Sequence, residues 1–281
     1  MATTVHQVRV QQLELSPPLT VLCPGYELGE WRAQALVDDL FSRHLTSFAL
    51  NYTEWNSIDG ETAAQALRNA AKSVYASDKY KRRGEFGELI LHAAAKDFFD
   101  AHPAISKIYY KDSDNDTVKG FDCVHIIEND GAIELWLGEV KYYKSLTEAI
   151  RDSTKELQDH LNNNFLRREF MAITSKLDPN WPHTQAVREL LDEARSLDDI
   201  LPHLVIPVLL TYDSSTVSGY SKISRDFVCD LKDESEKAWK RFIKALDIPY
   251  PVTLHLILVP IEDKERLTNL FHQKLNIWKH I

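Results

Sequence analysis

Apolar positions along the chain switch between strand-like and helix-like spacing. Residues 7–15 alternate apolar and polar side chains, and this alternation predicts a β-strand ahead of Pro17. Apolar residues then recur every three or four positions over residues 29–48 and 61–75, which predicts two amphipathic helices. The second segment is also rich in alanine, the residue with the highest intrinsic helix propensity.

The middle of the chain carries the clearest succession of elements. A helical period over residues 84–102 is followed by predicted strands at 105–110, 120–128 and 133–143. Asn129-Asp130-Gly131 lies between the last two strands and is a strong hairpin signal, because these residues tolerate the positive φ angles of tight turns. We therefore expect the three strands to form a meander.

The remaining elements alternate between helix and buried strand. Ser145 and Glu148 have the spacing of a capping box and begin a helix with an apolar stripe. Residues 204–212 and 253–261 are near-continuous apolar runs, as expected for strands buried on both faces. A last helix is predicted over residues 263–280. This order predicts an α/β fold in which a mixed central sheet is flanked by helices.

Composition narrows the class of protein. Among 281 residues, 33 Lys and Arg stand against 42 Asp and Glu, a net charge of −9 that argues against tight binding of nucleic acid over the whole surface. Three well-separated cysteines form neither a disulfide framework nor a zinc motif. The longest apolar runs are too short to cross a bilayer, and the N-terminus lacks the pattern of a signal peptide. We expect a cytoplasmic protein.

Candidate chemistry gathers on the second and third strands of the meander. Glu139 and Lys141 are two residues apart, so their side chains lie on the same face of one strand. The hairpin brings Asp122 on the neighbouring strand toward Glu139. The preceding helix presents Glu85, Glu88 and His92 at spacings i, i+3 and i+7, on one helical face. His92 is more easily explained by packing than by catalysis.

These residue types suit metal-assisted hydrolysis of a phosphodiester. Asp122, Glu139 and the backbone carbonyl of Val140 are hard oxygen donors of the kind that Mg²⁺ accepts, and the ammonium of Lys141 would orient or help to deprotonate a water molecule. The pattern [DE]-x-K alone is weak, since it occurs three times, but only Glu139–Lys141 lies in an apolar strand. The alternative is an ion pair at a solvated strand end.

Three short motifs carry a resemblance to a known family. Glu88 on a helix, Asp122 after a turn and Glu139-Val140-Lys141 on a strand resemble the PD-(D/E)xK nuclease superfamily. The motifs Gly84-Glu-Phe-Gly-Glu88, Gly120-Phe-Asp122 and Leu137-Gly-Glu-Val-Lys141 resemble the HamA family of the bacterial Hachiman anti-phage system. The resemblance covers about residues 80–280.

The resemblance implies a function and a set of residue roles. It implies a Mg²⁺-dependent DNA endonuclease, with Mn²⁺ as an alternative ion, that a HamB helicase holds inactive until aberrant DNA is sensed. Asp122 and Glu139 would bind the metal, Lys141 would be the catalytic lysine and Glu88 an accessory acid. Phe121 stands where the superfamily often has proline. Gln158 lacks the tyrosine that exonuclease-like members carry four residues later, so no end-processing activity is expected.

The resemblance also implies a division of the chain. Residues 79–281 would form a restriction-endonuclease-like core, and residues 1–78 an N-terminal α/β extension that packs on it and docks the partner. A basic run just before the Glu88 helix and one later lysine are expected to contact DNA phosphates, although a basic run is also typical of a solvated linker. These residues are Lys79, Lys81, Arg82, Arg83 and Lys144.

Two other functions remain open from the residues alone. The same fold would serve a catalytically inactive adaptor that docks a helicase. An RNA-directed nuclease would need the same metal and carboxylates, because hydrolysis of either nucleic-acid backbone is the same chemistry.

Overall fold

The computed structural model describes residues 4–74, 84–106, 120–129, 131–248 and 252–280. Its elements follow in this order: β1 (Gln7–Gln12), β2 (Leu19–Cys23), β3 (Tyr26–Glu27), β4 (Glu30–Trp31), α1 (Ala33–Ala49), α2 (Tyr52–Asn56), α3 (Ala63–Val74), α4 (Glu85–Phe99), β5 (His102–Ser106), β6 (Cys123–Asn129), β7 (Ala132–Tyr142), α5 (Leu146–His160), α6 (Asn163–Lys176), α7 (Thr184–Leu190), α8 (Leu197–Ile200), the 3₁₀ turn η2 (Leu201–His203), β8 (Leu204–Asp213), α9 (Ser215–Gly219), α10 (Arg225–Ala245), β9 (Thr253–Ile261) and α11 (Lys264–Trp278).

A mixed sheet runs through the centre of the fold. Within the described residues, seven strands are joined in the order β1-β2-β9-β8-β7-β6-β5. Strands β2, β9, β8 and β7 run parallel, whereas β1, β6 and β5 pair antiparallel with their neighbours. The predicted α/β fold with a mixed central sheet is therefore confirmed.

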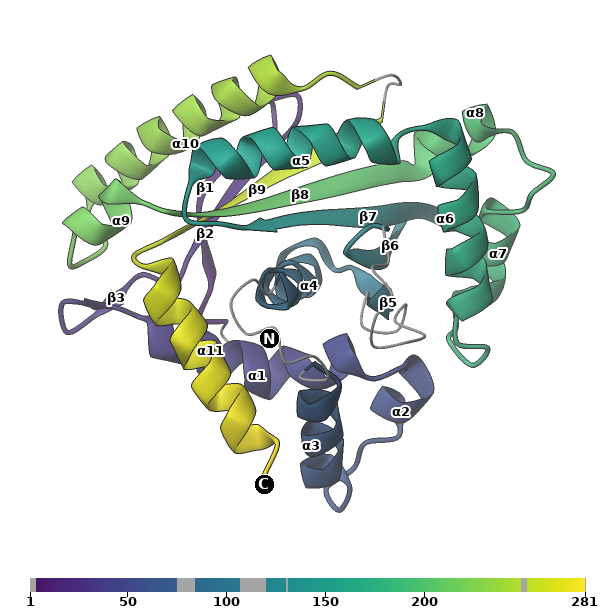
Figure 1. Ribbon diagram of the computed structural model, residues 1–281, viewed down its shortest axis with the longest axis horizontal. Coiled ribbons are helices and arrows are strands. Elements are labelled where there is room, and N and C mark those ends of the chain that lie inside the picture. The colour runs from purple at the N-terminus through teal and green to yellow at the C-terminus, as the bar shows by residue number, and fades with distance from the viewer. Residues whose placement is uncertain (1–3, 75–83, 107–119, 130, 249–251, 281) are drawn as a thin grey trace.

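Helices cover both faces of this sheet. In Figure 1, α5 and α10 lie over one face, while α4 lies against the other, with α1, α3 and α11 beyond it. Strands β8 and β9 are buried almost throughout, since residues on both of their faces contact helices. This double cover explains their continuous apolar sequence.

The hairpin of β6 and β7 forms as predicted. The two strands pair antiparallel from Cys123 opposite Gly138 to Asn129 opposite Ala132. Gly131 has φ +81°, the conformation that the turn requires and that glycine adopts without strain. Asp130, in the same turn, lies outside the described residues.

Glycines let α4 lie very close to β7. A Cβ added at Gly87 would stand 2.5 Å from Cγ1 of Val140 and 3.0 Å from Cβ of Tyr142. On the facing strand, a Cβ at Gly138 would stand 2.5 Å from Sγ of Cys123 and from Cδ2 of Leu91. The close approach places the N-terminal turn of α4, which carries Glu88, beside the C-terminal end of β7.

Several element boundaries differ from the predicted ones. The helix predicted over residues 84–102 ends at Phe99, because Asp100 adopts the left-handed conformation with φ +53°. As a result β5 begins at His102 instead of residue 105. The helix predicted over residues 29–48 begins at Ala33, after the short β3–β4 hairpin.

Elements that the hydrophobic pattern does not predict lie at the start and in the second half of the chain. They are β2 and the helices from α6 to α10. Strand β2 pairs with both β1 and β9, so the first strands of the chain extend the central sheet. The division into residues 1–78 and 79–281 stays a prediction.

Candidate active site

The pairing of β6 with β7 sets Asp122 opposite Glu139. Asp122 immediately precedes β6, and its backbone N–H donates to the carbonyl oxygen of Gly138 at 2.8 Å. Its carboxylate Oδ2 accepts a 2.8 Å hydrogen bond from the N–H of Val140. The carboxylate of Asp122 is thus fixed by the backbone of the same strand that carries Glu139 and Lys141.

Lys141 is buried and fully engaged. Its Nζ donates to Oε1 of Glu139 at 2.6 Å, to Oε2 of Glu156 at 2.6 Å and to the carbonyl oxygen of Val140 at 3.3 Å. An ammonium has three N–H donors, so these three acceptors satisfy it completely. Burial lowers the pKa of Lys141, but the negative charge of Glu139 and the contact with Glu156 outweigh burial and raise the pKa above its ordinary value.

Glu139 is the most deeply buried carboxylate of the cluster, with only 1% of its surface exposed. Burial and the nearby charge of Asp122 raise the pKa of Glu139 to about 7, against the opposing effects of His160 and Lys141. Two carboxylates that disfavour each other's ionisation in this way need a compensating cation. Lys141 supplies one positive charge, and the negative charge of the carboxylates would also favour binding of a second cation.

Glu88 comes from α4, which packs on the face of β7 that carries Val140 and Tyr142. It is buried near the N-terminus of that helix. Burial and the charges of Asp122, Glu88 and Glu139 together raise the pKa of the Cys123 thiol. The structure therefore brings Asp122, Glu139 and Lys141 into one cluster, places Glu88 near Cys123, and keeps Cys123 a protonated, buried thiol.

Two residues of the cluster were not predicted from the sequence, and both come from α5. Glu156 contacts Lys141, and Nδ1 of His160 lies 3.4 Å from Oε2 of Glu139. The two are one helical turn apart on α5, where His160 is buried and Glu156 is half-exposed at the border of the apolar face. A histidine on the apolar face is the one hint in the sequence, and it does not show which strand residues the helix meets.

Glu169 on α6 anchors the loop that leads to Asp122. Its Oε1 accepts a hydrogen bond of 3.2 Å from the N–H of Phe121. A Cβ at Gly120 would lie 2.9 Å from both carboxylate oxygens of Glu169. A side chain at position 120 of the Gly120-Phe-Asp122 motif would therefore displace the buried carboxylate of Glu169.

His92 faces away from this cluster. Its Nε2 lies 2.9 Å from Oγ of Ser47, and its Nδ1 lies 3.1 Å from Nε2 of His125. Both ring nitrogens thus have partners within the protein, which agrees with a role in packing. Glu85, two turns earlier on α4, is only half-buried.

The predicted phosphate contacts are only partly described. Lys144 follows β7, is half-exposed and pairs with Oε1 of Glu265 at 3.1 Å. The basic run of Lys79, Lys81, Arg82 and Arg83 lies outside the described residues.

The chemistry of the donor atoms fits a magnesium ion. Asp122 and Glu139 offer carboxylate oxygens. Val140 lies two residues beyond Gly138, where the pairing of β7 with β6 begins, and its carbonyl oxygen would be the third ligand. Across the residues that the structure describes, no group of three or more His, Cys, Asp and Glu side chains has a metal-ligating arrangement. A set of two carboxylates and one carbonyl agrees with the habit of Mg²⁺ of keeping several water ligands.

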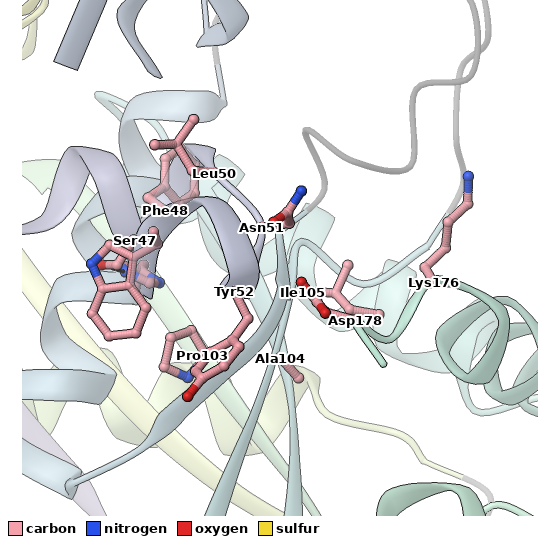
Figure 2. A pocket seen from close by; sticks show the side chains of 12 residues that line it. Ser47, Phe48, Leu50, Asn51, Tyr52, Pro103, Ala104, Ile105, Lys176 and Asp178 are labelled. Atoms are coloured by element: carbon pink, nitrogen blue, oxygen red, sulfur yellow. Dashed lines mark hydrogen bonds between the residues drawn. The ribbon is translucent and has the colours of Figure 1, made fainter. Parts of the chain in front are cut away.

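A small cavity lies away from the carboxylates. It has a volume of about 50 Å³ and is enclosed by the end of α1, by α2 and by β5. Figure 2 shows Tyr52 beside Pro103, and Ile105 beside Asp178, among the residues that line it. None of Asp122, Glu139 and Lys141 lines this cavity.

Comparison with known protein families identifies the family of this chain. The model of the HamA family matches residues 2–275. No curated protein matches the chain. None of the helices in the described part of the chain combines the length and apolar character needed to span a bilayer.

Proposed function

The chain belongs to the HamA family of Hachiman defence proteins, and from this premise we propose that it is the nuclease of that anti-phage system. In this proposal it hydrolyses DNA phosphodiesters with Mg²⁺ as an endonuclease. A HamB-like helicase holds it inactive and releases its activity when aberrant DNA is sensed. Residues 1–78 would contribute the docking surface for that helicase.

One observation carries the proposal. Asp122, Glu139 and Lys141 come from two paired strands and meet at the buried end of the β6–β7 ladder. Burying two carboxylates beside a lysine costs desolvation free energy unless a further cation or hydrogen bonds compensate the charges. A solvated ion pair at a strand end, the simpler alternative, does not fit side chains that are 1% exposed for Glu139 and 7% exposed for Lys141.

Each residue has a distinct part in the proposed reaction. Asp122, Glu139 and the carbonyl of Val140 would hold Mg²⁺, with Glu88 as an accessory acid. When bound, the ion would supply a nucleophilic water and stabilise charge on the phosphate. Lys141, whose pKa is raised, stays protonated at neutral pH. Its ammonium would therefore orient the attacking water and stabilise negative charge rather than remove a proton.

The test is cleavage of DNA by the complex of full-length chain and helicase with Mg²⁺. Replacing Glu139 and Lys141 together with alanine should abolish cleavage, because both the metal site and the ammonium are lost. Asp159→Asn, an exposed carboxylate on α5, is the matched control and should cleave as the wild type does. The assignment fails if wild type and double variant cleave equally.

Calorimetric titration with Mn²⁺ separates the nuclease from an inactive adaptor. The wild type should bind the ion, and Asp122→Asn should weaken binding at least tenfold, because one of two carboxylate ligands is lost. An adaptor would show no binding that depends on Asp122. Cleavage of RNA but not DNA under the same conditions would favour the RNA-directed nuclease.

A further inference from the structure

Helix α5 faces the proposed active site with one polar turn, Glu156 and His160, which we call the α5 pair. Glu156 contacts Lys141 and also hydrogen-bonds Glu139, and His160 contacts Glu139. The inference drawn from this arrangement rests on the proposed nuclease function, and it concerns residues that none of the three motifs contains.

The partners of Lys141 are not equivalent. Lys141 donates to three acceptors. Two of them, Oε1 of Glu139 and the carbonyl oxygen of Val140, belong to groups that are also ligands of the proposed metal ion. The third acceptor is Oε2 of Glu156, at 2.6 Å. Glu156 comes from α5, which contributes no ligand to the proposed metal site. Glu156 is therefore the acceptor that can hold the ammonium while the other two groups serve the metal.

The remaining exposure of Glu156 supports this division of roles. Its side chain is 47% exposed, whereas that of Lys141 is 7% exposed. Glu156 thus reaches the buried ammonium from the solvent side, where a substrate phosphate would arrive. Contact with a charged carboxylate there keeps the Lys141 side chain extended along one direction.

His160 is itself held rigidly. Its ring stacks on Phe165 at 4.4 Å between centroids and meets the edge of Phe121 at 5.0 Å. Its Nδ1, 3.4 Å from Oε2 of Glu139, is buried and makes no well-aligned hydrogen bond within the described residues. A ring fixed by two aromatic neighbours presents this nitrogen to the second oxygen of Glu139.

We infer that the α5 pair positions the catalytic pair: Glu156 fixes the ammonium of Lys141, and His160 fixes the carboxylate of Glu139. Both act through another residue and touch neither the scissile phosphate nor the leaving group. Neighbours that orient metal ligands and catalytic groups typically change activity 10- to 100-fold when they are removed.

The first experiment measures DNA cleavage by the full-length chain with its helicase and Mg²⁺. Glu156→Ala should lower kcat about 10- to 100-fold and leave KM for duplex DNA within about threefold, because positioning and not binding is lost. Glu156→Gln keeps an oxygen acceptor and should recover most of kcat. Wild-type kcat in Glu156→Ala, or an equal loss in the α5 control Asp159→Asn, would overturn the inference.

The second experiment needs no activity. Melting temperatures are compared for Lys141→Met, Glu156→Ala and the double variant. If the two side chains interact, the loss of melting temperature in the double variant should be at least about 2 °C smaller than the two single losses added together. The reason is that the second substitution removes a group whose partner is already gone. Additive losses would show that the contact is absent and would overturn the inference. If coupling is found but the wild type cuts no nucleic acid, the proposed function fails instead.

Discussion

Burial sets the protonation of individual side chains on both faces of the sheet. Near the proposed site it favours the neutral form of Glu139 and of the Cys123 thiol. On the same face as Cys123, burial lowers the pKa of His125 to about 3, and elsewhere burial lowers that of His6 to about 4. These imidazoles are neutral in the folded protein at pH 7, so folding excludes protons that the unfolded chain would bind.

His255 turns this into a prediction of pH dependence. Burial lowers its pKa from 6.5 to about 4, and its Nε2 lies 2.9 Å from Oγ1 of Thr20. Below pH 6.5 the unfolded chain takes up a proton that the folded protein refuses. The stability is therefore complete above pH 6.5 and is lost as the pH falls toward 4, by about 1 kcal/mol per pH unit for this residue.

Urea unfolding at several pH values between 7.5 and 5 measures this effect. His255→Gln should unfold with a free energy that falls less steeply with acid than that of the wild type. Equal slopes for the two proteins would show that His255 takes up its proton in the folded state.

At the scale of residues, spacing in the sequence was enough to predict that Asp122, Glu139 and Lys141 lie together. Glu139 and Lys141 share a face by their period of two, and the hairpin signal brings Asp122 beside them. Glu156 and His160 could not be found in this way, since their contacts depend on where α5 docks. No local pattern in the chain specifies that docking.

At the scale of elements, the contact of α4 with β7 depends on the absence of a side chain. Alanine in place of glycine within a helix normally stabilises it by about 1 kcal/mol. Gly87→Ala should instead lower the free energy of unfolding by about 1–3 kcal/mol, because the new methyl group would overlap Val140. Chemical denaturation of the two proteins tests this expectation.

Gly219 provides the control for this substitution. It also lies in a helix, α9, and a Cβ there meets no atom within 4 Å. Gly219→Ala should leave stability unchanged or raise it by up to about 1 kcal/mol. Equal effects at the two positions would contradict the close packing of α4 on β7.

Element prediction succeeded where hydrophobic periods are long and failed where the chain turns sharply. The pattern predicts the β6–β7 hairpin and the buried strands β8 and β9. It extends α4 too far, because nothing in the local sequence shows that Asp100 adopts a left-handed conformation. Strand β2 has only five residues, too few for a run of apolar side chains to be told from a loop that packs into the core.

At the scale of the whole molecule, acidic residues outnumber basic ones, and several surface cations lie in ion pairs. The net charge is −9. After β7 and on α5 and α11, basic side chains pair with acidic neighbours: Lys144 with Glu265 at 3.1 Å, Arg151 with Asp152 at 2.7 Å and Arg266 with Glu262 at 2.7 Å. Few of these charges remain to replace the counterions of DNA.

The isolated chain should therefore bind duplex DNA weakly. We expect a Kd above about 1 µM at about 0.15 M salt, since affinity for DNA follows the number of phosphates that are neutralised. Fluorescence anisotropy with a labelled duplex measures this, and the same duplex with the helicase complex is the comparison. Sub-micromolar binding by the chain alone would refute the expectation.

The sheet order has a consequence for how the protein is made. Strand β2 ends at Cys23, but its parallel partner in the sheet is β9, which begins only at Thr253. A ribosome adds about 5–20 residues per second, so the β1–β2 segment waits on the order of ten seconds or more before its partner emerges. During translation an apolar strand is left with an unpaired edge. Biogenesis of this protein therefore depends on protecting that edge until synthesis reaches the last strand.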